Sequence, residues 1–238
     1  MALGGQGAPL APIFHDLMFR SPKQARWVLN LGGIANLTGL VPGRATFGFD
    51  TGPANILMDA WTQRVQGQKY DRDGAWARGA RLVPALLQDL LADPYFALAP
   101  PKSTGRELFN VDWLLARLKS HADLDPADVQ RCLLELSVRS VSDAMAGAAV
   151  GVADGAGTQG ELLVCGGGAD NTFLMQRLAE LNPRLRVART EDMGVPGEAV
   201  EAMAFAVFAQ KTLRGIEVDT PSITGASRAC LLGTVYRP

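Results

Sequence analysis

Glycines that stand directly beside short apolar runs constrain the fold of this chain more than any other feature. The chain has 26 glycines among 238 residues, about 11%, where about 7% is usual. The groups beside apolar runs are Gly32–Gly33, Gly48 with Gly52, and Gly166–Gly168. Glycine next to a strand indicates a tight turn or a close approach of the backbone to a bound molecule. The pattern therefore favours strands that end at ligand-contacting turns.

The order of the predicted elements indicates an α/β chain with a mixed sheet. The predicted strands cover 27–31, 35–41, 45–49, 162–165 and 185–187. The first three form an antiparallel meander, because Gly32–Gly33 and Val41–Arg44 supply its turns.

Apolar residues at helical spacing predict the helices of the chain. The predicted helices cover about 56–65, 75–91, 126–151, 172–182 and 199–213. Residues 4–12 are rich in glycine and proline and are expected to have no regular structure. Long irregular loops are uncommon and often functional, so the loop predicted over 93–107 is of interest, whereas 155–160 is an ordinary predicted loop.

The overall composition excludes several classes of protein. The 23 basic and 24 acidic residues nearly cancel, which argues against a broad electrostatic grip on nucleic acid or an anionic membrane. Hydrophobic residues make up 47% of the chain, too many for a disordered protein. No apolar run approaches about 18 residues, and no signal peptide is visible at the start.

The cysteines and histidines do not form a catalytic or metal-binding pattern. Cys132, Cys165 and Cys230 are odd in number and widely spaced, which indicates a reducing cytoplasm and neither a disulfide framework nor a CxxC metal pair. His15 and His121 form no pair with a nucleophilic serine or cysteine, and we interpret both as structural.

The turn Asn30–Asn36 between the first two predicted strands is a candidate phosphate site. Gly32 and Gly33 let backbone amides approach a phosphate with no Cβ in the way. The segment matches neither a Walker loop nor GxGxxG, and a plain glycine hairpin is the alternative interpretation.

Asp50 is a candidate general base, because it ends a predicted strand and precedes a Gly-Pro turn into a predicted helix. Ligand sites of α/β folds collect at such strand ends, and a carboxylate there can accept a proton. The alternative is that Asp50 only caps the turn or the helix.

Two further segments carry residues suited to anions or sugars. Gly166–Gly168 form a strand-to-helix junction that favours an anion or a closely packed flat base. The loop 100–107 contains Lys102, two hydroxyls and Arg106, a set that suits phosphate or sugar. A solvated loop is the alternative.

Taken together, these segments resemble the anhydro-N-acetylmuramic acid kinase family, of the acetate/sugar kinase, Hsp70 and actin class. The matching stretches are 4–12, 28–38, 48–61, 70–77, 93–110, 162–171, 200–209 and 224–233. The combination of GFDTGP, PPKSTGRE and CGGGADN is specific, and the resemblance covers nearly the whole chain.

The resemblance implies a ribonuclease H-like actin/sugar-kinase fold and a reaction. ATP, with Mg²⁺, phosphorylates 1,6-anhydro-N-acetylmuramic acid while water opens the anhydro bridge. The product is N-acetylmuramic acid 6-phosphate, formed in the recycling of cell-wall peptidoglycan.

The resemblance also implies roles for particular residues. Asp50 is the general base that acts on water. The residues implied to bind nucleotide are Asn30, Gly32, Gly33, Gly166, Gly167, Gly168 and Asn171. The residues implied to bind the sugar are Thr51, Gly52, Asn55, Lys102 and Arg106. No residue of the chain is predicted as a metal ligand.

The chain departs from the family pattern in two places. Ala54 stands where the family commonly has glycine, which would cost about 1 kcal/mol if the position needs a positive φ. The family's first phosphate loop is absent, so we interpret residues 1–24 as the end of a first domain. Residues 25–238 are then the second, nucleotide-binding domain, with a helical insertion over about 53–152. We expect little or no kinase activity from this chain alone.

Two alternatives stay open at this point. The chain is either such a kinase or a remnant that binds nucleotide without catalysis. A related kinase for another sugar is a third hypothesis. Retention of Asp50 argues mildly against a remnant. The sequence leaves a homodimer open.

Overall fold

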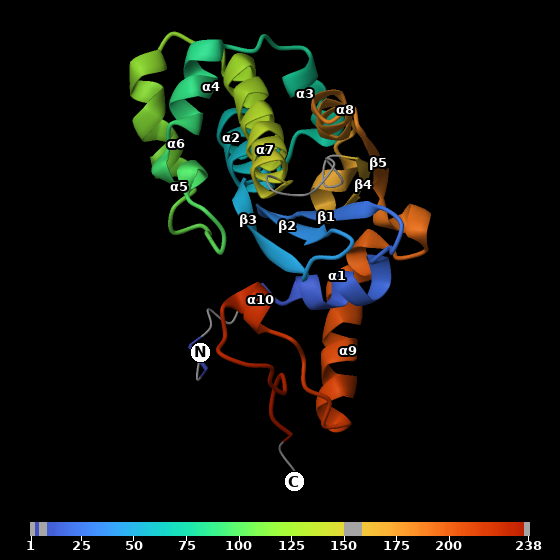
Figure 1. Cartoon of the computed structure of the whole chain (residues 1–238). Helices are drawn as coiled ribbons and strands as arrows, with labels where there is room; N and C mark the ends of the chain where they lie inside the picture. Colours follow the sequence, from blue (N-terminus) through green and yellow to red (C-terminus); the bar gives the residue numbers. More distant parts are fainter. Residues whose placement is uncertain (1–2, 5–8, 150–158, 236–238) are drawn as a thin grey trace.

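The computed structural model describes residues 3–4, 9–149 and 159–235, which contain a five-stranded mixed sheet. The strands are β1 (Ala25–Leu31), β2 (Ile34–Leu40), β3 (Phe47–Pro53), β4 (Gly160–Cys165) and β5 (Leu185–Arg189). Their order is β3-β2-β1-β4-β5 (Figure 1). Strands β1, β2 and β3 pair antiparallel, whereas β4 runs parallel to both β1 and β5. The predicted mixed sheet and its antiparallel meander are confirmed.

Helices connect and cover these strands. The α-helices are α1 (Ala11–Phe19), α2 (Asn55–Gln66), α3 (Ala75–Arg78), α4 (Pro84–Leu91), α5 (Pro94–Ala97), α6 (Val111–Leu118), α7 (Pro126–Ala149), α8 (Thr172–Leu181), α9 (Val200–Leu213) and α10 (Pro221–Thr224). Helices α2, α7, α8 and α9 confirm four predicted helices. The predicted end of the α7 helix near Gly151 and most of the loop predicted over 155–160 lie outside the described residues.

The single helix predicted over 75–91 is wrong, because α3 ends at Arg78 and α4 begins only at Pro84. Proline disfavours a helical conformation in the residue before it, and Val83 accordingly is extended. Proline itself suits the first position of a helix, so Pro84 separates the two helices and starts the second. Leu82, Leu86, Leu87, Leu90 and Leu91 keep helical spacing, and this spacing alone predicts one continuous helix.

Two other segments were predicted without helix. Helix α1 begins at Ala11, inside the range expected to be irregular, and it buries Phe14 and Phe19 completely. Helix α5 is a single short turn inside the predicted loop 93–107, and α6 was missed. Helix α1 packs into the same core as β1 and β2, and the domain boundary at residue 24 stays a prediction.

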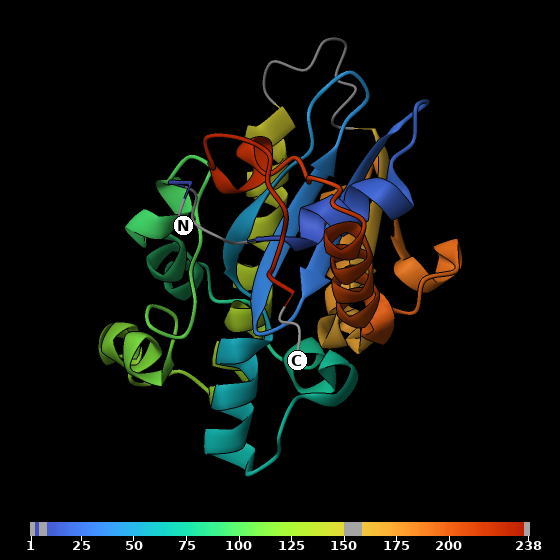
Figure 2. The same ribbon diagram turned by 90° about the horizontal axis from the view of Figure 1, so that it is seen from below.

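Helices cover both faces of the sheet, since successive strand residues point to opposite sides. Leu29 and Leu37 belong to a core shared with α2, α4, α7 and α8, whereas Val28 and Leu40 belong to a core shared with α1 and α9. Figure 2 shows α1 and α9 side by side on the near face of the sheet, with α7 behind it. The helices between β3 and β4 stand where the insertion over 53–152 is predicted, and its limits stay a prediction.

The Gly32–Gly33 turn between β1 and β2 holds the start of α2. The backbone N–H groups of residues 54–56 donate to the Gly32 and Gly33 carbonyls at 2.9–3.1 Å. The first N–H groups of a helix have no partner within the helix, so the turn caps α2. Ala54 has a φ of −108°, so the strain considered for alanine at this position does not arise.

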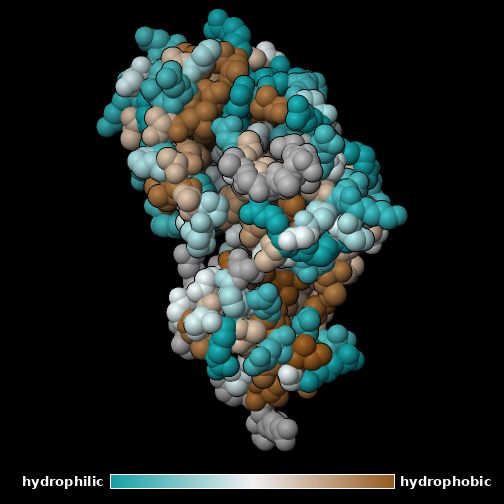
Figure 3. Space-filling model, in the orientation of Figure 1, coloured by the Kyte–Doolittle hydropathy of each residue, from teal (hydrophilic) through white to brown (hydrophobic). Residues whose placement is uncertain are grey.

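Apolar side chains reach the surface near the C-terminal helices. Figure 3 shows hydrophobic surface in the lower part of the molecule, where α9 and the following segment lie. Phe205 and Leu213 on α9, and Ile216 and Leu231 beyond it, are exposed. Across the described ranges, the structure contains no helix with the length and apolar character needed to cross a membrane.

Candidate active site

A row of polar side chains crosses three strands of the sheet and ends at Asp50. In the strand register, Asn30 lies opposite Asn36, and Asn36 lies opposite Asp50. The Asn30 Nδ2 donates to the Asn36 Oδ1 at 3.4 Å, and the Asn36 Nδ2 donates to the Asp50 Oδ1. Asp50 is only 5% exposed, so these contacts hold its carboxylate in one orientation. The expectation that Asp50 ends its strand is wrong, because β3 continues to Pro53.

The loop after α5 supplies the other contacts of Asp50. The Ser103 Oγ and the Thr104 backbone N–H donate to the Asp50 Oδ2 at 2.9 and 3.0 Å. The Asp50 backbone N–H donates to the Lys102 carbonyl at 3.1 Å, and the Tyr95 hydroxyl donates to the Asp50 carbonyl at 2.7 Å. The predicted irregular loop is thus fastened to β3 at the candidate base.

Among the described residues, every donor to the Asp50 carboxylate is neutral. Three donors occupy three of the roughly four acceptor positions of a carboxylate, one on Oδ1 and two on Oδ2. Within the described ranges, no lysine or arginine forms an ion pair with Asp50. The remaining position on Oδ1 suits a water whose proton the carboxylate can take.

A cavity of about 520 Å³ brings together predicted residues from distant parts of the chain. Gly32, Gly33, Asn55, Arg106 and Gly167 all line it. The Asn55 Nδ2 donates to the carbonyls of Leu31 and Gly32 at 3.0 and 2.9 Å, so its side chain holds the glycine turn. An arginine facing glycine turns across a cavity is an arrangement that suits phosphate oxygens.

A second cavity, of about 370 Å³, continues from the first. The two share Asn55, Asp59 and Gly167, and the predicted Asn171 lines the second. The Asn171 Oδ1 accepts the Leu174 backbone N–H at 3.0 Å, so its side chain also caps α8. Together the cavities form a groove, called here the glycine groove, which runs from Arg106 to Asn171.

The glycines of 166–168 have different surroundings. Gly166 has a φ of +80°, and a Cβ there would lie 2.4 Å from the Asn30 Oδ1. A Cβ on Gly168 would lie 2.6 Å from that of Leu31. A Cβ on Gly167, which lines the glycine groove, would meet nothing within 4 Å. Two of the glycines therefore let the chain pack against β1, and the middle one leaves room for a ligand.

Three residues predicted to contact sugar lie elsewhere. Thr51 and Lys102 line a separate cavity of about 410 Å³, and Gly52 lies against Phe96. The Lys102 ammonium donates to the carbonyls of Tyr95 and Phe96 at 3.2 and 3.4 Å. Burial lowers the pKa of this ammonium. Lys102 thus has a structural role, and its contact with substrate stays a prediction.

Several residues of the site were not predicted. Asn36, Ser103 and Thr104 orient Asp50, and only the strand register and the loop contact reveal this. Asp59 lines both cavities, and burial raises its pKa to about 6. A signal for Asp59 exists in the sequence, because it follows Asn55 by four residues and so shares its helix face.

Four carboxylates line the second cavity, those of Asp59, Asp71, Asp73 and Asp170. The described residues contain no group of three or more histidine, cysteine, aspartate or glutamate side chains that could hold a metal ion. Mg²⁺ at phosphate sites is often bound by one or two carboxylates together with substrate phosphates. Asp59 beside the glycine groove fits that arrangement, in which the ion arrives with a nucleotide.

Two solved structures are similar to this chain, the first of them well enough to show its fold. The activator of the 2-hydroxyisocaproyl-CoA dehydratase from Clostridium difficile, with bound ADPNP, matches with a TM-score of 0.51 and 11% identity, over 87% of this chain and 69% of that chain. Ligand-bound xylulose kinase from Lactobacillus acidophilus matches with a TM-score of 0.45 and 13% identity, over 83% of this chain and 41% of that chain.

The fold is the ribonuclease H-like fold of actin and the sugar kinases. The family model of anhydro-N-acetylmuramic acid kinase matches residues 1–238. The chain therefore belongs to the anhydro-N-acetylmuramic acid kinase family, a family of ATP-dependent sugar kinases, and the resemblance found in its motifs is confirmed.

Proposed function

We propose that this chain carries the general base and nucleotide groove of a kinase for 1,6-anhydro-N-acetylmuramic acid. The observation that carries the proposal is the continuity between the Asn30–Asn36–Asp50 row and the glycine groove. Gly166, next to the groove-lining Gly167, packs against Asn30 at one end of the row. A base and a phosphate site joined in this way suit a reaction that activates water and transfers a phosphoryl group.

In the proposed reaction, water supplies a new oxygen to the sugar. The Asp50 carboxylate takes a proton from the water, and the water oxygen bonds to C1 of the sugar. The bond from C1 to O6 breaks, O6 bonds to the γ-phosphorus of ATP, and ADP leaves. The products are N-acetylmuramic acid 6-phosphate, ADP and the proton first held by Asp50.

The glycine groove is the proposed place of ATP. Gly32, Gly33 and Arg106 would face its phosphates, and Gly167 and Asn171 its adenosine end. Asp59, the carboxylate that lines both cavities, would be available to a Mg²⁺ ion, which when bound neutralises phosphate charge.

The other residue roles carried over from the family remain part of the proposal. Thr51, Gly52, Asn55 and Lys102 are the proposed sugar contacts, together with Arg106. We also propose that a further domain completes the sugar pocket. The three free cysteines support a reducing, cytoplasmic location.

Two measurements test the proposal. Mg-ATP should raise the midpoint of thermal unfolding of the 238-residue chain, because a ligand that binds only the folded state stabilises it. The longest in-frame protein that contains these residues should convert the anhydro sugar to its 6-phosphate, and in ¹⁸O-labelled water the label should appear at C1 of the product.

The outcomes separate the alternative functions. Nucleotide binding without turnover of any sugar by the longest in-frame protein would favour a non-catalytic nucleotide binder. Phosphorylation of a different sugar in a substrate screen would favour a related kinase. A chain that unfolds cooperatively but shows no shift with Mg-ATP would contradict the proposed groove.

A further inference from the structure

A buried glutamine without hydrogen-bond partners among the described residues lines the second cavity of the glycine groove. Gln130 of α7 lines this cavity and is completely buried. Neither its amide nitrogen nor its amide oxygen has a hydrogen-bond partner among the described residues. A buried amide without partners is costly, and such groups are rare in folded proteins. A ligand bound in the cavity could supply the hydrogen bonds that this amide lacks.

The residues that line the cavity indicate which class of ligand it suits. Met58, which is almost fully buried, and Tyr70, which is about half exposed, supply its apolar part. The charged part of the lining is supplied by Asp59, Asp71, Arg72, Asp73 and Asp170. The apolar part suits a flat, weakly polar ring, because aromatic side chains stack on nucleobases. Asn55, Asp59 and Gly167 connect this cavity to the part of the groove that Arg106 lines. A molecule with a flat base at one end and phosphates at the other fits both cavities.

We infer that Gln130 reads the adenine base, as the residue that makes this site prefer adenine over guanine nucleotides. Its amide presents one donor group and one acceptor side by side. The N7 and 6-amino group of adenine present the complementary acceptor and donor, and glutamine pairs with adenine in this way elsewhere. The corresponding edge of guanine presents two acceptors, which would leave the amide oxygen unpaired. The inference rests on the proposed use of ATP.

The test measures binding of Mg-ADP and Mg-GDP to the 238-residue chain by calorimetry. The wild-type chain should bind ADP at least about tenfold more tightly than GDP, the effect expected of one bidentate amide–purine pair. Gln130→Met should lose most of this preference through weaker ADP binding. Its unfolding midpoint should stay the same or rise, because the substitution removes an unpaired buried amide. Gln88→Met, on the exposed face of α4, is the matched control and should change nothing.

A second measurement leaves the protein unchanged. The wild-type chain should bind 7-deaza-ADP more weakly than ADP, because the ring acceptor is gone. This comparison decides the matter even if Gln130→Met does not fold.

The failure of this inference is distinct from the failure of the proposed function. If the wild-type chain binds ADP, but Gln130→Met keeps the affinity and the preference, Gln130 has no part in reading the base. Equal binding of ADP and 7-deaza-ADP leads to the same conclusion, and the proposed kinase survives. If the wild-type chain binds neither nucleotide, the proposed function fails together with this inference.

Discussion

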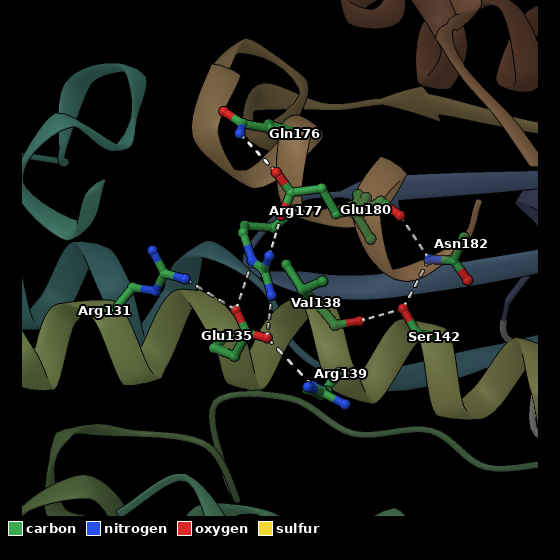
Figure 4. A network of polar contacts seen from close by, with 10 residues as sticks. Arg131, Glu135, Val138, Arg139, Ser142, Gln176, Arg177, Glu180 and Asn182 are labelled. Atoms are coloured by element: carbon green, nitrogen blue, oxygen red, sulfur yellow. Dashed lines mark hydrogen bonds and ion pairs between the residues drawn. The ribbon is translucent and has the colours of Figure 1, made fainter. Parts of the chain in front are cut away.

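Asp50 and Glu135 are both buried carboxylates that accept several hydrogen bonds, but their donors differ in charge. Neutral groups of Asn36, Ser103 and Thr104 surround Asp50 at the end of the polar row. Arginines surround Glu135 between α7 and α8 (Figure 4). The same side-chain chemistry therefore serves two purposes within one domain.

The arginines make Glu135 part of the structural frame. Arg177 of α8 donates to its two oxygens at 2.9 and 3.0 Å, and Arg139 and Arg131 lie 3.3 and 3.7 Å away. Burial by itself raises the pKa of Glu135, but the hydrogen bonds and charge of Arg177, with the charges of the other arginines, lower it overall. Asp50 instead accepts its hydrogen bonds from neutral groups of the described residues. The charge of its hydrogen-bond donors therefore decides whether a buried carboxylate suits a catalytic or a structural role.

The largest expected effect is on catalysis and comes from Asp50→Asn. In the longest in-frame protein that contains these residues, kcat should fall by about 10²–10⁴-fold, the usual contribution of a general base. Mg-ADP binding should change little, whereas the unfolding midpoint should fall, because the new amide NH2 faces a donor where a carboxylate oxygen accepted one. Unchanged turnover of the anhydro sugar would remove Asp50 from the mechanism and end the contrast with Glu135.

The converse result is expected of Glu135→Ala. Removing one member of a buried ionic cluster leaves arginines without their partner, and we expect a loss of about 3–5 kcal/mol in the free energy of unfolding. Urea denaturation measures this loss. Arg139→Ala is the control, because its side chain is 42% exposed and should contribute at most about 1 kcal/mol. A stable Glu135→Ala protein with weakened nucleotide binding would reverse the roles assigned here.

The buried His15 should make the stability of the chain depend on pH. Its Nδ1 contacts the Thr38 Oγ1 at 2.8 Å, and burial lowers its pKa to about 4. The unfolded chain binds a proton near pH 6.5, whereas the folded chain does not until about pH 4. The free energy of unfolding should therefore fall as the pH drops from 6.5 to 4, by about 3 kcal/mol in total.

Substitution separates this contribution of His15 from that of the carboxylates. Denaturation of His15→Asn at several pH values should show that part of the slope missing, while His121→Asn should retain it. An unaltered slope in His15→Asn would mean that other groups set the acid sensitivity.

The smallest effects are expected from alanine substitutions at the neighbouring Gly166 and Gly167. Gly166→Ala should cost about 1–3 kcal/mol of stability, because φ is +80° and ψ is 169°, a region nearly restricted to glycine. Gly167→Ala should leave stability unchanged, yet it adds a methyl group to a residue that lines the glycine groove. We expect Mg-ADP binding to weaken by about 5- to 100-fold, the cost of one methyl group too many in a packed site. Calorimetry of both variants, with thermal unfolding beside it, would contradict this division if the two behaved alike.

The parts of the site that are local in sequence were predicted well. The glycine groups beside short apolar runs led to the Gly32–Gly33 turn and to Gly166–Gly168, and the structure places the turn and Gly167 on one cavity. The strand positions and four helices followed from the spacing of apolar residues. The helix over 75–91 failed because the effect of Pro84 on Val83 outweighs a continuous leucine stripe.

The partners of Asp50 could not be predicted in the same way. Asn36 is 14 residues from Asp50, and Ser103 is 53 residues away. Contacts at such separations depend on strand register and on how a loop folds back, neither of which local spacing encodes. Gln130 was missed for the same reason, because its buried position becomes unusual only once the cavity around it is known.

The sequence by itself determined the class of fold, the family and the residue types at the strand ends, since these depend on local periodicity and short motifs. Only the tertiary structure decided that Asp50 has neutral donors while Glu135 has arginines, and that Lys102 fastens a loop. Local pattern sets where elements form, but the charge and burial of a side chain are set by whatever the rest of the chain brings beside it.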